Sequence, residues 1–142
     1  MSIVVGVTSR PESQAALEAA IEEARLRGAR LHIVRTVATE VSESFARIRS
    51  WSGDVADTEE QGRAMVEDLA ARGVEAEFRI EPVSSDPARV LLDVAREVDA
   101  DLIVLGLRRR SAVGKLVLGS VSQDVLLGAE CPVLSVYAPE EG

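Results

Sequence analysis

Residues that build disulfides, zinc sites and base-stacking surfaces are nearly absent from this sequence. Its 142 residues include one cysteine, Cys131, and one histidine, His32, and only 3% are aromatic. A single cysteine excludes a disulfide within the chain. One cysteine and one histidine are also too few ligands for a typical zinc site. So few rings leave little to stack on nucleic-acid bases. The core must consist of Val, Leu, Ile and Ala, which favours a parallel sheet between helices.

The sequence also has fewer basic than acidic residues and lacks long apolar runs. The formal net charge is −8, so the chain as a whole repels a nucleic-acid backbone, although one small anion can still be held locally. No apolar run reaches the length of a membrane span, and the opening MSIVVGVTSRPES lacks the basic region of a signal peptide. We therefore expect a cytoplasmic protein without nucleic-acid or membrane partners, folded as one domain over residues 1–142.

Apolar runs typical of buried strands alternate with helical patterns along the chain. The strands are expected at residues 3–7, 31–37, 74–80, 101–105 and 132–137. The helices are expected at about residues 10–27, 58–73, 87–98 and 120–128. This alternation predicts an α/β fold, an open five-stranded parallel sheet in the order 3-2-1-4-5 with helices on both faces.

Capping and turn residues indicate where these elements begin and end. Three pairs have the spacing of a capping box at a helix start: Ser9 and Glu12, Thr58 and Gln61, and Ser120 and Gln123. Gly28 and Gly73 are placed to close helices in a left-handed conformation. Pro82 is expected to end the third strand, and Gly106 the fourth. Residues 38–57 show no clear period, and we expect a long connection there with at most a helical turn.

The stretch from Asp101 to Val121, DLIVLGLRRRSAVGKLVLGSV, is where we expect a ligand. In an open parallel sheet, ligands bind beyond the carboxyl ends of the strands, where the strand order reverses. The first and fourth strands flank that point, and their loops are residues 8–11 and 106–118. The helix that follows offers unpaired N–H groups and the positive end of its dipole, which favour a phosphate. The stretch therefore predicts a nucleotide-binding domain.

The loop after the fourth strand has neither the G-x-G-x-x-G nor the G-x-x-x-x-G-K-[ST] pattern of other nucleotide-binding folds. It has Gly106, a segment of twelve residues, and then Gly119 followed by Ser120. At this point the chain resembles the universal stress protein family, whose nucleotide-binding members carry G-x-x-G, nine further residues and then G-S or G-T. Arg109 stands in place of the second glycine, and Thr8 stands where those members usually have an aspartate.

The resemblance extends over nearly the whole chain. It includes I-V-V-G-V at residues 3–7, L-H-I-V at 31–34, D-L-I-V-L-G at 101–106, L-G-S-V at 118–121 and C-P-V-L-S-V at 131–136. It implies the adenine nucleotide alpha hydrolase-like fold and a small regulatory module of the stress response that binds ATP or AMP. Mg²⁺ would accompany ATP, with at most slow ATP hydrolysis. A homodimer through the C-terminal strand is also implied, and an apolar strand at a sheet edge is a pairing hazard on physical grounds.

The resemblance assigns a role to each candidate contact. Val7 and Thr8 would line the base and ribose side, and Thr36 would approach the adenine from the second strand. The phosphates would meet a further set of residues: Gly106, Gly119, Ser120, Val121 and Ser122. Each has a structural alternative, since Val7 also suits the core, Ser120 an N-cap and the glycines their turns.

Arg109 leaves two functions open. Its side chain removes the conformational freedom of glycine and can fill the space of a phosphate. Yet residues 108–110 are three arginines in an acidic chain, and guanidinium groups bind phosphate bidentately. The first hypothesis is therefore weak adenine-nucleotide binding, and the second is a ligand-free member that acts as a protein-interaction module. A dedicated enzyme is disfavoured, because no acid, base, nucleophile or metal set converges in the sequence, and His32 is expected to be packed or solvated.

Overall fold

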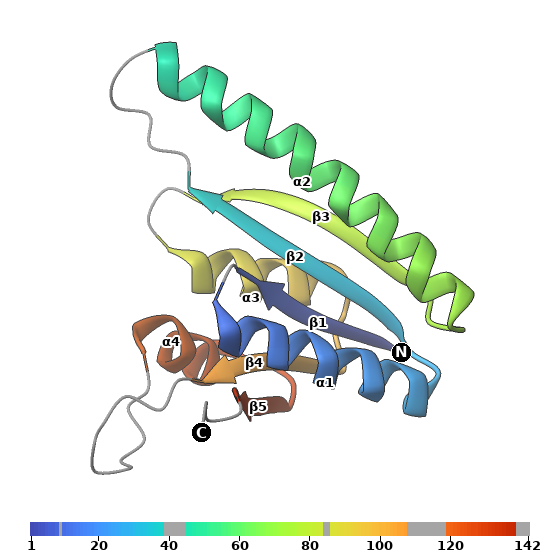
Figure 1. The fold of residues 1–142 in the computed structure, drawn as a ribbon. Coiled ribbons are helices and arrows are strands. Elements are labelled where there is room, and N and C mark those ends of the chain that lie inside the picture. Colours follow the sequence, from blue (N-terminus) through green and yellow to red (C-terminus); the bar gives the residue numbers. More distant parts are fainter. Residues whose placement is uncertain (9, 39–44, 84–85, 108–118, 139–142) are drawn as a thin grey trace.

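A computed structural model describes residues 1–8, 10–38, 45–83, 86–107 and 119–138 (Figure 1). Strands and helices alternate along these residues, as the sequence predicts. The strands are β1 (Ser2–Val7), β2 (Arg30–Ala38), β3 (Ala76–Val83), β4 (Leu102–Leu107) and β5 (Val133–Tyr137). The helices are α1 (Pro11–Arg27), α2 (Phe45–Ala71), α3 (Pro87–Glu97) and α4 (Ser120–Gly128).

The described strands form one sheet in the order β3-β2-β1-β4-β5, and every pairing in it is parallel. This confirms the predicted α/β fold and its strand order. β1 is central, because Val5 pairs with Ile33 of β2 on one side and with Val104 of β4 on the other. The order reverses between β1 and β4, so the carboxyl ends of these two strands mark the place where a ligand site is expected.

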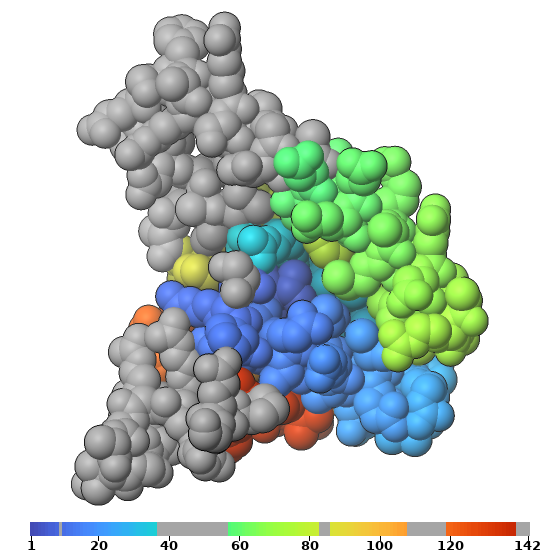
Figure 2. Space-filling view, viewed as in Figure 1, coloured from blue at the N-terminus to red at the C-terminus, as the bar shows by residue number. Residues whose placement is uncertain are grey.

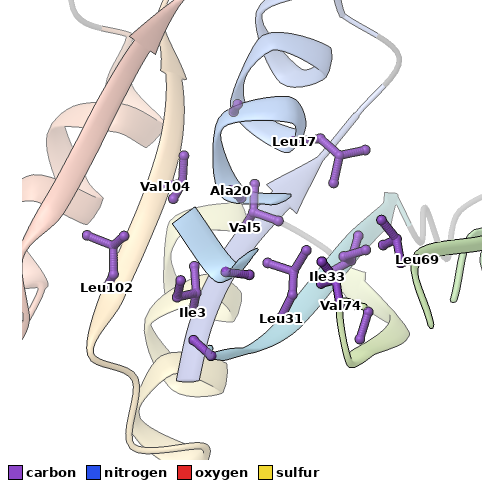
Figure 3. Packing of buried hydrophobic residues seen from close by; sticks show 14 of the residues in the cluster. Ile3, Val5, Leu17, Ala20, Leu31, Ile33, Leu69, Val74, Leu102 and Val104 are labelled. Atoms are coloured by element: carbon purple, nitrogen blue, oxygen red, sulfur yellow. The ribbon is translucent and has the colours of Figure 1, made fainter. Parts of the chain in front are cut away.

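One face of the sheet packs against α1 and α2. Because side chains alternate along a strand, Ile3 and Val5 of β1 point to this face together with alternate residues of β2 and β4. Figure 3 shows them near Leu17 and Ala20 of α1. In the space-filling view α1 lies beside the C-terminal part of α2, which contributes Leu69 to the same cluster (Figure 2).

The opposite face packs against α3 and α4, so helices cover both faces as predicted. Its buried side chains form a second cluster of sheet and helix residues: Val4, Val34, Ile103, Leu105, Leu91, Val94 and Val125. Leu91 and Val94 are three residues apart on α3, the spacing that places both side chains on one side of a helix. None of the described helices combines the length and the apolar character that a membrane crossing requires.

α2 is the largest departure from the sequence prediction. It begins at Phe45, inside the stretch 38–57 that was expected to be a long connection, and runs for 27 residues. Thr58 therefore lies within the helix, and the capping box predicted there is wrong. Small and polar residues obscured the helical period in the sequence, but no proline interrupts the segment, and a helix that packs on one side needs only a narrow apolar stripe. Near the C-terminal end of that stripe, Leu69 is buried in the core.

Pro82 and Gly106 lie inside their strands instead of ending them. Pro82 pairs with Val37 of β2. Because β3 is at the edge of the sheet, the missing N–H of proline breaks no ladder. Gly106 pairs with Val136 of β5. Both predicted strand ends were wrong. A local sequence pattern shows neither that β3 is an edge strand nor that β5 pairs with β4 at Gly106.

The helix starts also differ from the predicted capping boxes. The N-cap of α1 is Arg10 and that of α4 is Gly119, and neither makes a side-chain cap hydrogen bond. Ser120 is the first residue of α4 and not its cap, so that prediction is wrong, and Ser9 lies outside the described residues. Both glycines that were predicted to close helices have left-handed backbones, with φ of 63° and 84°: Gly28 and Gly73.

Candidate functional site

A cleft of about 660 Å³ opens at the carboxyl ends of β1, β2 and β4. Residues from the first turns of α1, α3 and α4 also line it. The three helix starts lie at the same end of the sheet in Figure 1. This is the end at which the strand order reverses between β1 and β4, where parallel sheets bind their ligands.

Eight of the nine residues that the sequence assigns to the site line this cleft together. They come from the ends of three strands and the start of one helix: Val7, Thr8, Thr36, Gly106, Gly119, Ser120, Val121 and Ser122. Val7 is buried, whereas Thr8 and Ser120 are exposed. Arg109 lies outside the described residues. The contacts that these residues would make with a nucleotide stay predictions.

Gly106 forms part of the cleft wall where α1 touches β4. A Cβ atom at this position would lie 2.0 Å from the carbonyl oxygen of Glu12 and 2.5 Å from its carbonyl carbon. Both atoms belong to the backbone of the first turn of α1, which cannot move without moving the helix. Gly106 lies in a strand and has no left-handed φ. The close approach of α1, and not a turn, therefore explains this glycine.

Gly119 leaves the start of α4 open to the cleft. Among the described residues nothing lies within 4 Å of a Cβ placed on it, and its backbone is extended, with φ −68° and ψ 162°. As N-cap it has no side-chain oxygen, and the Gln123 N–H donates to its carbonyl at 3.0 Å. The N–H groups of Ser120, Val121 and Ser122 come earlier in the helix and have no intrahelical acceptor. Together with the helix dipole they attract an anion.

Three hydrogen bonds tie the end of β1 to the start of α1. The Thr8 N–H donates to Ser13 Oγ at 2.6 Å, and the Arg10 N–H donates to Thr8 Oγ1 at 3.2 Å. The Ser13 N–H donates to the Arg10 carbonyl at 3.1 Å. Ser13 is only 6% exposed, so its bond to the exposed Thr8 is partly buried. These contacts fix the backbone of Thr8 and Arg10 relative to α1 before any ligand arrives.

The charged residues that line the described part of the cleft are Arg10 and Glu12. Hydroxyl groups come from Thr8, Thr36 and the serines of α1 and α4. Within the described ranges, no three His, Cys, Asp or Glu side chains lie where they could share a metal ion. In its described part, the cleft combines the Arg10 guanidinium with hydroxyl and backbone N–H donors, which are the groups that hold phosphates and sugar hydroxyls.

His32 and Cys131 do not line the cleft. His32 on β2 is 5% exposed, and its Nδ1 lies 3.3 Å from Oε2 of Glu77, without the alignment of a hydrogen bond. Burial lowers the pKa of His32 more than the Glu77 carboxylate raises it, so the neutral imidazole is favoured. Burial raises the pKa of the Cys131 thiol, which is partly buried beside the core under α3. Both residues are part of the packing.

Sequence reasoning assigned no ligand contact to the strand residues Gly6 and Leu105, which line the cleft, nor to two further groups of lining residues. The first group belongs to the start of α1: Arg10, Glu12 and Ser13. Ser13 carried a signal, because it lies four residues before Leu17 on the buried stripe of α1, where a hydroxyl group needs a partner. The second group is Pro87 and Leu91 of α3. Nothing local identifies them, since the packing of α3 over β1 brings them to the cleft.

Known proteins match this chain over nearly its whole length. The model of the universal stress protein family matches residues 1–136. A universal stress protein of Mycolicibacterium smegmatis is 42% identical over 136 residues, which is 94% of this chain and 95% of that relative. The match therefore includes β1, β4 and the start of α4, which carry the cleft.

Solved structures agree with the sequence comparison. A universal stress protein from Archaeoglobus fulgidus has a TM-score of 0.69 at 34% identity, over 96% of this chain and 98% of the other. The structure of a universal stress protein from the same organism in complex with dAMP has a TM-score of 0.64 at 30% identity, over 96% and 97% of the two chains. The chain therefore belongs to the universal stress protein family.

Proposed function

We propose that this universal stress protein is a regulatory module that binds an adenine nucleotide, AMP or ATP, in the cleft between β1, β4 and α4. The observation that carries the proposal is the convergence of the eight sequence-assigned residues on one cleft, at the point where the strand order reverses. The open first turn of α4 supplies N–H donors for a phosphate there. The A. fulgidus protein in complex with dAMP supports the same class of ligand.

In this proposal the base and ribose lie on the side of β1 and β2, and the phosphates lie on the side of β4 and α4. Val7 supplies an apolar contact, and the hydroxyl groups of Thr8 and Thr36 supply hydrogen bonds. The first-turn N–H groups of residues 120–122 hold a phosphate, and Arg109 adds a guanidinium from the loop after β4. Mg²⁺ would enter with ATP, on its phosphate oxygens. The role is binding, with at most slow ATP hydrolysis.

Thermal unfolding with nucleotide tests the proposal. AMP or ATP at ten times its Kd should stabilise the native state by about 1.4 kcal/mol, which raises Tm by roughly 4 °C for a chain of this length. In the variant Gly119→Leu this increase should disappear, because the new side chain enters the open space at the start of α4. The ligand-free variant should keep a single cooperative transition, since no described atom lies in its way.

A flat response to both nucleotides at millimolar concentration would contradict nucleotide binding. It would favour the second function, a protein-interaction module without a ligand. Two neighbouring side chains of α4 support that alternative: Leu126 is 39% exposed and Leu127 is 78% exposed. Exposed apolar side chains mark a contact surface where they form a continuous patch.

We also infer that two copies of the chain pair through β5. The other edge strand, β3, carries the alternating charges Glu77, Arg79 and Glu81 and then a proline, features that deter edge pairing. β5 reads V-L-S-V-Y, with no charge and no proline, so its outer edge, which pairs with none of the described strands, suits a second chain. Sedimentation equilibrium should give twice the chain mass of 15.2 kDa. A single monomeric species at every concentration would exclude this dimer.

A further inference from the structure

Arg10 is an exposed arginine that makes no ion pair among the described residues, and it lines the cleft. Other arginines of α1 are paired: Arg25 lies 2.6 Å from a Glu22 carboxylate oxygen and Arg27 lies 2.9 Å from one of Glu23. Arg10 therefore presents a guanidinium at the cleft that no carboxylate of the described chain neutralises.

The position of Arg10 breaks two local rules of helix stability. It is the N-cap of α1, a position where Ser, Thr, Asp and Asn are preferred because their side chains accept a hydrogen bond from the first turn. A cation at this end of a helix also meets the positive end of the dipole, which is unfavourable. Residues that break local rules in this way are typical of functional sites. The cost to the helix suggests that the charge serves a ligand.

The backbone of Arg10 is held in place while its side chain is left unpaired. Its N–H donates to Thr8 Oγ1 at 3.2 Å, and its carbonyl accepts from the Ser13 N–H at 3.1 Å. Pro11 follows and favours the extended conformation that Arg10 has, with φ −85° and ψ 150°. The guanidinium therefore extends from a fixed point on the same cleft that the open first turn of α4 lines.

We propose that Arg10 binds the phosphate of the nucleotide and gives the site its preference for AMP over unphosphorylated adenosine. The inference rests on the proposed function and adds a residue to it. A guanidinium donates two parallel hydrogen bonds to a phosphate, and the N–H groups of α4 supply further donors. Arg10 also offsets the negative charge of Glu12, the other charged residue that lines the described cleft.

Calorimetric titration of AMP and of adenosine tests this assignment with two matched variants. Arg10→Asn should weaken AMP binding by about tenfold or more and adenosine binding by less than about twofold, because only AMP carries the anion. Arg89→Asn removes the same charge from another exposed arginine, in the first turn of α3, which does not line the cleft. It should change AMP binding by less than about twofold, since Arg89 does not line the cleft and salt screens its exposed charge.

A second readout separates phosphate binding from a structural role. Asn is a good N-cap, so Arg10→Asn should raise the ligand-free Tm by about 3 °C while it weakens AMP binding. A structural role would move stability and affinity down together. The assignment is overturned if AMP and adenosine lose affinity equally, if neither does, or if the wild-type protein binds adenosine as tightly as AMP. A wild-type protein that binds neither compound overturns the proposed function, and the Arg10 assignment with it.

Discussion

Replacing Gly106 with alanine is expected to lower the free energy of unfolding by about 3 kcal/mol or more. The added Cβ would lie 2.0 Å from the Glu12 carbonyl oxygen, far inside contact distance. Overpacking typically costs about 1–3 kcal/mol when side chains can shift. Here the obstacle is helix backbone, which has no rotamer to change, so the cost belongs at or above the top of that range. Urea unfolding followed by circular dichroism measures the loss.

Gly119→Ala is the matched control for Gly106→Ala. The same methyl group is added to the other glycine of the sequence pattern, but among the described residues nothing lies within 4 Å of it. Its cost should stay below about 1 kcal/mol, the difference between glycine and alanine at an N-cap. Equal losses in the two variants would show that the contact between β4 and α1 is not the reason for the glycine at 106.

Replacing Leu69 with alanine is expected to cost about 2–5 kcal/mol, the range for a buried leucine whose removal leaves a cavity. Leu69 is 1% exposed. It lies in the cluster that joins α2 to the sheet, near Val74 and Ile33 (Figure 3). Because it is a buried contact of the long helix, the substitution tests how firmly α2 is attached. Chemical denaturation gives the change from the midpoint and the slope.

Leu127→Ala removes the same atoms from a leucine that is 78% exposed on α4. Its effect should be within about 0.5 kcal/mol, as for surface substitutions in general. The contrast between the two leucines isolates burial from residue type. If Leu69→Ala is as mild as Leu127→Ala, the packing of α2 against β2 and β3 contributes little to stability.

The sheet could be predicted from the sequence because each strand carries its own signal. β1 and β4 are nearly continuous runs of Val, Ile and Leu, the pattern of strands buried on both faces. α2 could not be predicted in full, because the sequence of its first half has no apolar period that distinguishes a helix from a loop. The prediction that Pro82 ends its strand was wrong for a similar reason, since only the assembled sheet shows that β3 is an edge strand.

Some features of the candidate site could likewise be predicted from the sequence, and others could not. The glycine and serine at 119 and 120 could be placed at a helix start from local pattern, and the structure puts them in the cleft. The reason for Gly106 could not be predicted, because its contact with Glu12 joins segments far apart in the sequence. The role proposed for Arg10 could not be predicted from the sequence either, because an arginine beside a helix start has no periodic or capping signal. The proposal depends on the ion pairs in the structure, since Arg25 and Arg27 are paired and Arg10 makes no ion pair among the described residues.

The two edge strands of the sheet, β3 and β5, differ in their capacity to pair with another chain. In the proposed dimer, β5 pairs with a second chain, whereas the opposite edge strand, β3, carries alternating charges and a proline. Both outer edges of the joint sheet would then be β3 strands, and neither would offer a template for a third chain. The proposed dimer would therefore not grow into a filament by edge pairing, because the charges and the proline of β3 oppose pairing at both outer edges.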